Sequence, residues 1–335
     1  MSVTSLAHDA TAGRTNRTKR AVAMVFAING VALGSLLSRT PALKDDLDLS
    51  VSRLGLLLVC MSIGAMAALP ASGAIVHRFG AAHAVLGSAA IETAGLLMGA
   101  AGVALGTVVM TGAGLLVMGF GNSLWDVAMN VEAADVERRL DRTVMPRFHA
   151  GWSMGSVSGA GLGALCAAVG IGLTAQLAAT AALIMPVVGL GVRAFHPIEA
   201  AADSRSTSSR SLLLAAWRDS RTLLVGLMVL AFAFTEGVAN DWLAVAFVEG
   251  LRSSEVVGAA GFGIFVVAMT VGRLAGGGLI DRWGRVTVLR GTAVLAAAGV
   301  TLVILAPTAC VGLRRSLCVG TWRRSRLSHW HERCR

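Results

Sequence analysis

Charged residues are scarce in this sequence: they make up 14% of its 335 residues, whereas hydrophobic residues make up 55%. A soluble domain carries about 25% charged residues, so the chain lacks the polar surface that a water-soluble protein needs. It also has no tyrosine, so an aromatic belt at a membrane surface has to come from tryptophan and phenylalanine. These absences exclude a soluble globular protein and indicate a chain that folds in lipid.

Apolar runs of about 20 residues recur along the chain, the length that crosses about 30 Å of hydrocarbon as a helix. The sequence therefore predicts an all-α polytopic membrane protein. Residues 1–20 are polar and basic without a cleavage site, which predicts a cytoplasmic tail before a retained first span. The expected spans are 21–39, 54–76, 84–104, 107–129, 149–169, 171–191, 222–241, 256–277 and 286–306.

Lysine and arginine set the expected orientation, because cytoplasmic loops carry an excess of them. With the N-terminus in the cytoplasm, the inside segments before residue 310 carry 17 of these residues and the outside segments carry 4. This asymmetry predicts a multi-pass protein of the cytoplasmic membrane. The net charge of +10 then reflects topology and a basic C-terminal segment, and it does not indicate nucleic-acid binding.

One eight-residue phrase occurs twice, as GAIVHRFG at 73–80 and as GGLIDRWG at 277–284. Each copy falls in a short predicted cytoplasmic loop after the second helix of a group. An internal repeat of this kind indicates two related halves. The polar segment 193–221 lies between the copies and is typical of a linker.

Six helices, a linker and a second set of helices with the same loop phrase resemble the major facilitator superfamily, whose members contain two parallel six-helix halves. The resemblance implies a six-helix bundle at 21–192 and a partial C-terminal bundle of three helices at 222–309. The stretches at 119–130, 137–155 and 235–242 resemble a bacterial branch of sugar-permease-like or uncharacterised members. The loop signature of the family, approximately G-x-L-x-D-R-x-G-R, corresponds to Gly73, His77, Arg78 and Gly80 in the first copy and to Gly277, Asp281, Arg282, Gly284 and Arg285 in the second.

The second copy predicts a conformational gate. Asp281 is expected to dock on the positive N-terminal end of the fifth span, near His149, in one conformation only. The alternative is a plain interface charge. His77 stands where the family signature has the acid, and it cannot supply a fixed negative charge there.

Four glycines recur every fourth residue in the fifth span and form a smooth helix face where another helix can approach closely. They are Gly151, Gly155, Gly159 and Gly163. The alternative is the glycine–proline motif of drug–proton antiporters. Ala160 occupies the proline position of that motif, so drug efflux is the less favoured function.

Ionisable and amide side chains inside the spans are the candidate site residues. An ionisable side chain at mid-membrane costs about 2.5–3.5 kcal/mol, so each one is expected to have a partner or a function. Glu236 is the first candidate for proton coupling and Glu92 is the second, since an apolar setting favours the protonated form of a carboxyl group. Asp126 and Asn130 are four residues apart and share a helix face. Asn29 is an uncharged candidate on the first span.

Structural alternatives remain open for several of these residues. Asp126 and Glu132 are close to the predicted cytoplasmic end and are candidates for capping or for pairing with Arg138 or Arg139. Arg273 lies within a span and is expected to pair with an acid as a structural residue.

The sequence contains no zinc-protease, serine-hydrolase or phosphate-loop motif, which predicts no enzyme activity, no metal and no cofactor. It predicts a secondary transporter of a small polar solute such as a sugar or metabolite, coupled to protons. The alternative is a truncated, non-transporting remnant, or a membrane sensor or assembly partner of the same fold. This alternative is considered because the arginine-rich segment 310–335 is typical of translation in a shifted reading frame. The other interpretation of the segment is a basic tail that contacts anionic lipid.

Overall fold

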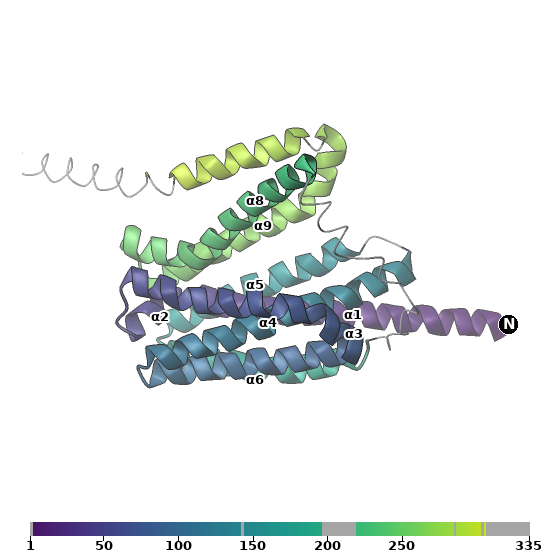
Figure 1. The fold of residues 1–335 in the computed structure, drawn as a ribbon, viewed down its shortest axis with the longest axis horizontal. Helices are drawn as coiled ribbons and strands as arrows, with labels where there is room; N and C mark the ends of the chain where they lie inside the picture. Colours follow the sequence, from purple (N-terminus) through teal and green to yellow (C-terminus); the bar gives the residue numbers. More distant parts are fainter. Residues whose placement is uncertain (1–2, 142–143, 196–218, 285, 303–304, 306–335) are drawn as a thin grey trace, which may run out of the picture. The chain divides into compact units, whose positions relative to one another are not determined.

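The computed structural model describes residues 3–141, 144–195, 219–284, 286–302 and 305, and within them the chain is helical without a β-strand. Most of the predicted linker and the whole of segment 310–335 lie outside the described residues. The helices are α1 (Val3–Leu37), α2 (Thr40–Asp46), α3 (Val51–Ala104), α4 (Val108–Leu140), α5 (Met145–Ala168), α6 (Leu173–Val192), α8 (Ser220–Val245, followed by a π-helical turn at Ala246–Gly250), α9 (Glu255–Trp283) and a further helix at Val286–Leu302 (Figure 1).

Six of these helices are long and apolar enough to cross a membrane: those within Thr15–Leu37, Val51–Ala104, Val108–Leu140, Leu173–Val192, Ser220–Gly250 and Glu255–Gly272. Helix α3 has 54 residues and is interrupted by a kink at Gly80, so it consists of two helical segments. These segments account for the second and the third predicted spans. The expected all-α membrane architecture is confirmed.

The chain divides into two units. The first comprises Met1–Val248 and Ser253–Leu274, and the second comprises Glu249–Arg252 and Ala275–Arg335. In the first unit α3 packs along α4 and α6, and α1 packs along α5 and α6.

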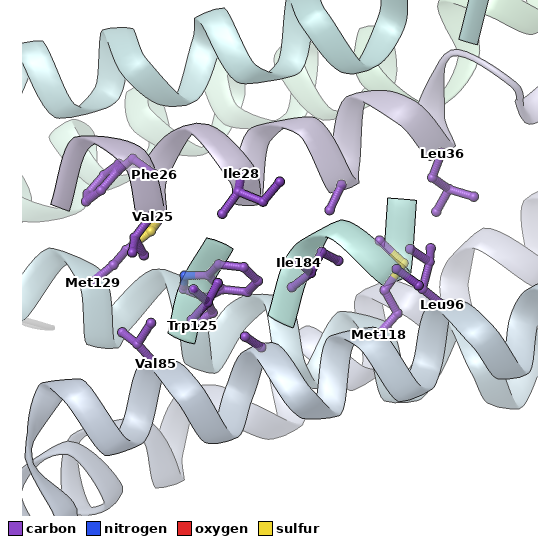
Figure 2. Packing of buried hydrophobic residues seen from close by; sticks show 14 of the residues in the cluster. Val25, Phe26, Ile28, Leu36, Val85, Leu96, Met118, Trp125, Met129 and Ile184 are labelled. Atoms are coloured by element: carbon purple, nitrogen blue, oxygen red, sulfur yellow. The ribbon is translucent and has the colours of Figure 1, made fainter. Parts of the chain in front are cut away.

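The core of the first unit is apolar and lies among α1, α3, α4 and α6 (Figure 2). Trp125 of α4 is its largest side chain, and Phe26, Met118 and Ile184 are likewise fully buried. Large apolar side chains also cover the outside of the helices. Because lipid tails are as apolar as the core, the helices show no single apolar stripe, and their polar residues mark the interior instead.

Two of the repeated glycines end helical segments in the same way. Gly80 has φ 81° at the kink of α3, and Gly284 has φ 78° directly after α9. A positive φ is easily adopted only by glycine. The two copies of the phrase therefore make equivalent turns, and the predicted loop at 77–83 is a kink between two helical segments.

The small-residue face of α5 lies against α1. A Cβ atom at Gly30 would meet the backbone of Trp152 and Ser156, and one at Gly155 would meet the backbone of Ala27. This close approach fixes the height at which the side chains of the two helices face each other.

Candidate functional site

A cluster of polar and aromatic side chains lies where α1, α4 and α5 meet. We call it the α4–α5 polar cluster; it consists of Asn29, Asp126, Asn130, His149 and Trp152. The indole Nε1 of Trp152 donates a 2.8 Å hydrogen bond to Asn29 Oδ1, and Asn130 Nδ2 donates to Asp126 Oδ1 at 3.2 Å. Asp126 interacts electrostatically with His149. The structure thus brings three of the sequence-predicted site residues together and adds two that sequence reasoning did not select.

Helix geometry explains why these side chains meet. His149 and Trp152 are one turn apart on α5, and Asp126 and Asn130 are one turn apart on α4, so each pair shares a helix face. The ring of His149 packs edge-on against Phe26 of α1 at 5.5 Å between centroids, one turn from Asn29. Gly30, next to Asn29, admits the α5 backbone at Trp152.

The amide of Asn29 is only partly satisfied. Its side chain is 2% exposed, and its Nδ2 has no hydrogen-bond partner within the described part of the chain. An unmade hydrogen bond of a buried amide costs about 1–3 kcal/mol. The cluster therefore retains an unused donor beside the Trp152 indole.

The alternative that Asp126 pairs with Arg138 or Arg139 is wrong. Both arginines bind Asp135, at 3.0 Å and 2.6 Å. Asp126 is twelve residues from Arg138, about 18 Å along the helix. Its carboxylate accepts a hydrogen bond from Asn130 instead.

Glu92 lies outside the cluster, in the contact between α3 and α4. Its side chain is fully buried, Asn122 Nδ2 donates to its Oε2 at 3.5 Å, and its Oε1 has no partner among the described residues. A Cβ atom at Gly121 would meet the backbone of Glu92, so the tight contact of α3 with α4 shields this carboxyl. Asn122 precedes Asp126 by one turn of α4, and the two sites share a helix.

Glu236 lies on α8 and is partly exposed. The structure does not place it in the cluster, and its proton-coupling role stays a prediction. The side chain of Arg273 lies outside the described residues, so its expected pairing is not tested.

The gate residues of the two loops are only partly described. His77 and Arg78 are exposed, and the guanidinium of Arg78 stacks at 5.5 Å over the ring of Phe79. Arg282 is also exposed. Nothing is described of the side chains of Asp281 and Arg285, so docking of Asp281 stays a prediction.

The N-terminus of α5, where Asp281 was expected to dock, already has a carboxylate on it. Glu137 Oε2 accepts hydrogen bonds from the backbone N–H groups of Val144 and Met145, both at 2.7 Å. An acid at this end of a helix is favoured by the unpaired N–H groups and the helix dipole. Glu137 therefore caps α5, which the sequence analysis missed although the acid stands eight residues before the helix.

Arg39 is the second residue that sequence reasoning missed. From its position it was expected to be only a charge at the end of a span, yet its side chain is 5% exposed and binds groups on several helices. One signal was available: Gln176, which accepts from Arg39, is the only glutamine in the chain.

No group of three or more metal-ligating side chains occurs among the described residues. Helices long and apolar enough to cross a membrane enclose the amide of Asn29 and the carboxyl group of Glu92. Such an arrangement is typical of a membrane transport protein.

The comparisons with known proteins agree with this class. The family model described as Major Facilitator Superfamily matches residues 21–322. The chain is 31% identical over 289 residues to the uncharacterized transporter y4wD of Sinorhizobium fredii, covering 86% of this chain and 74% of that protein. It is 28% identical to an uncharacterized MFS-type transporter of Yersinia pestis, covering 89% and 75% of the two chains. The solved structure of the nucleoside transporter NupG is similar in fold, with a TM-score of 0.61 at 17% identity, over 81% of this chain and 68% of that one.

The chain belongs to the major facilitator superfamily, as its repeated loop phrase predicted. It is a membrane transporter and not an enzyme. The family match continues beyond residue 309, into the segment that the sequence analysis interpreted as a shifted frame. That interpretation stays an expectation.

Proposed function

We propose that the protein is a proton-coupled secondary transporter that moves a small hydroxylated solute, such as a sugar or a related metabolite, by alternating access. The positive-inside asymmetry of the loops supports an N-terminus in the cytoplasm and residence in the cytoplasmic membrane. Relatives that are named as transporters support the transport activity. The solute class rests on the chemistry of the α4–α5 polar cluster.

The observation that carries the proposal is the hydrogen bond of the buried Asn29 with Trp152, together with the Asp126–Asn130 pair on α4, whose carboxylate is exposed. Amides donate and accept, and a carboxylate accepts from hydroxyl groups. A tryptophan presents a flat apolar face beside its single N–H donor. Together these groups match a ring or chain that alternates C–H surface with hydroxyls, and they offer one carboxylate.

The proton-carrying role is assigned first to Glu92, with Glu236 kept as the second candidate. A buried carboxyl group without a cationic partner is held at lower cost when it is neutral. Glu92 meets this condition, because Asn122 supplies its hydrogen bond and no cation is paired with it in the described part of the chain. Deprotonation would then be coupled to rearrangement of the α3–α4 contact.

Uptake into proteoliposomes under an imposed pH gradient tests the proposal. The probes are radiolabelled hexoses, pentoses and polyols, with a protonophore as the energetic control. Asp126→Asn should lower kcat/KM about ten- to a hundredfold, since a hydrogen bond to a charged group is worth about 1.5–3 kcal/mol. Glu92→Gln should abolish the response to the pH gradient while solute exchange continues.

Asp135→Asn is the matched control, because Asp135 lies on the same helix and binds only surface arginines in the salt bridges described. It should transport like the parent protein. Inserted, monodisperse protein that takes up none of the probes would contradict the proposed solute class. Failure to transport any solute would favour the non-transporting alternative.

A further inference from the structure

Arg39, just beyond the end of α1, is held by groups from two other helices. Its Nη1 donates to the carbonyl oxygens of Gly163 on α5, at 3.3 Å, and of Ile171 in the α5–α6 turn, at 3.4 Å. The same nitrogen donates to Oε1 of Gln176 on α6 at 3.1 Å. The guanidinium is thus fixed in a buried position at one end of the bundle.

The acceptor on α6 is fixed in turn. Nε2 of Gln176 donates to the backbone oxygen of Ser35 at 3.0 Å and to its hydroxyl at 2.9 Å, and that hydroxyl lies 3.1 Å from the hydroxyl of Thr180. All three side chains are buried. A buried network of this kind holds its members in one arrangement, so Arg39 has little freedom to follow a partner that moves.

The carboxylate that pairs with Arg39 comes from the other side of the linker. Oε2 of Glu255, the first residue of α9, lies 3.3 Å from Nη2 of Arg39. The Glu255 side chain is 35% exposed, against 5% for Arg39. Asp46 on α2 also interacts electrostatically with Arg39, but α2 directly follows Arg39 in the chain and moves with it.

From these contacts we propose that Arg39 and Glu255 form a latch that closes this end of the transporter. The pair stabilises the conformation in which the first half of α9 lies against α1 and α5. When α9 moves away, the buried guanidinium of Arg39 loses its Glu255 partner, and an unpaired buried charge is unfavourable. Glu255 lies in the first turn of its own helix, so the dipole of that helix still stabilises it. The proposal rests on the proposed alternating access and adds a contact that sets its conformational balance.

An apolar contact just below the latch provides a reporter. Ala160 of α5 is 1% exposed and belongs to one cluster with Leu37, Phe262 and Val266. It lies eight residues before the end of α5, about 12 Å. A cysteine at this position should react with a thiol reagent only when α9 moves away.

The experiment measures the alkylation rate of Ala160→Cys in full-length protein whose five native cysteines are replaced by serine. A membrane-impermeant maleimide is applied to intact cells and to inverted vesicles. Glu255→Gln should raise the rate about tenfold from the side at which α9 begins, which the proposed topology places outside. Glu255→Lys should raise it further, and Glu255→Asp should stay within about twofold of the parent.

Asp45→Asn is the matched control, since Asp45 is an exposed acid at the same end that binds Lys44. It should leave the alkylation rate unchanged. An unchanged rate in Glu255→Gln, with Glu255→Lys also unchanged, would refute the latch. Comparable elution of all variants in size-exclusion chromatography shows that they are folded.

Uptake measured on the same preparations separates the two proposals. If the parent protein takes up solute but the alkylation rate does not change in the Glu255 variants, the latch is refuted and the transport proposal is not. If the alkylation rate changes in the Glu255 variants but the parent protein takes up no solute, the transport proposal is refuted. The latch then remains as a conformational contact.

Discussion

A single methyl group added at position 155 should separate α1 from α5. The Cβ atom of Gly155→Ala would meet the carbonyl oxygen of Ala27, and it would lie 2.7 Å from the Ala27 carbonyl carbon and 2.9 Å from its Cα. All three are backbone atoms, so no rotamer change can relieve the overlap. Because non-bonded carbon atoms prefer about 3.5–4.0 Å, the helices must move apart by roughly 1 Å.

The magnitude follows from two opposing terms. Alanine in place of glycine favours a helix by about 0.8–1.0 kcal/mol, and overpacking of a well-packed contact costs about 1–3 kcal/mol. Gly161 on the same helix has nothing within 4 Å of its Cβ position, so Gly161→Ala receives the first term alone. The difference between the two variants therefore isolates the overpacking, and Gly155→Ala should be about 1–3 kcal/mol less stable.

Thermal unfolding of the purified protein in lipid nanodiscs, followed by tryptophan fluorescence, measures this difference. Gly151→Ala should fall between the two variants, because its Cβ would lie 3.3 Å from the Ala23 carbonyl oxygen, a contact that a small shift relieves. The predicted order of Tm is Gly161→Ala, then Gly151→Ala, then Gly155→Ala. Equal Tm values for positions 155 and 161 would refute the close contact of α1 with α5.

Two further outcomes concern helix ends. Glu137→Gln should lower the free energy of unfolding by about 1 kcal/mol, because the charged cap on the Val144 and Met145 N–H groups becomes neutral. Hydrogen exchange of these two amides should become faster. Unchanged exchange would count against the cap. Asp219→Ala should fray the first turn of α8, since Asp219 accepts from the hydroxyl and the N–H group of Thr222. These hydrogen bonds lower the pKa of Asp219, so the cap is present at neutral pH and is lost only as the pH falls below the usual range of an aspartate. Protection of the Thr222 amide that disappears already near pH 5 would contradict this sign.

Much of the fold was predictable because few backbone structures are stable inside a lipid bilayer. Only helices satisfy every backbone hydrogen bond within a single segment of a membrane, so apolar runs alone located the helices. The repeated phrase predicted two equivalent loops. The structure adds that Gly80 and Gly284 both turn the chain with a positive φ, which only glycine adopts easily. The ends were less predictable: α2 and the polar start of α1 came without an apolar signal.

The candidate site was predictable only residue by residue. Spacing on one helix related Asp126 to Asn130, since residues four apart face the same way. No spacing related Asn29 to Trp152, because their hydrogen bond joins two helices separated by 123 positions in the chain. For the same reason the partners of Arg39 were not foreseen.

The amino-acid sequence by itself determined that this protein folds in a lipid membrane, that its apolar segments are helical and which family it belongs to, because these depend on local composition, period and motif. Which polar side chains share an interior position was decided only in the tertiary structure. Helix faces meet through the rotation and closeness of packed helices, which the glycines of α1 and α5 permit but which no single segment encodes. The paired Asn29 and Trp152, the shielded Glu92 and the link from Arg39 to Glu255 all depend on that packing.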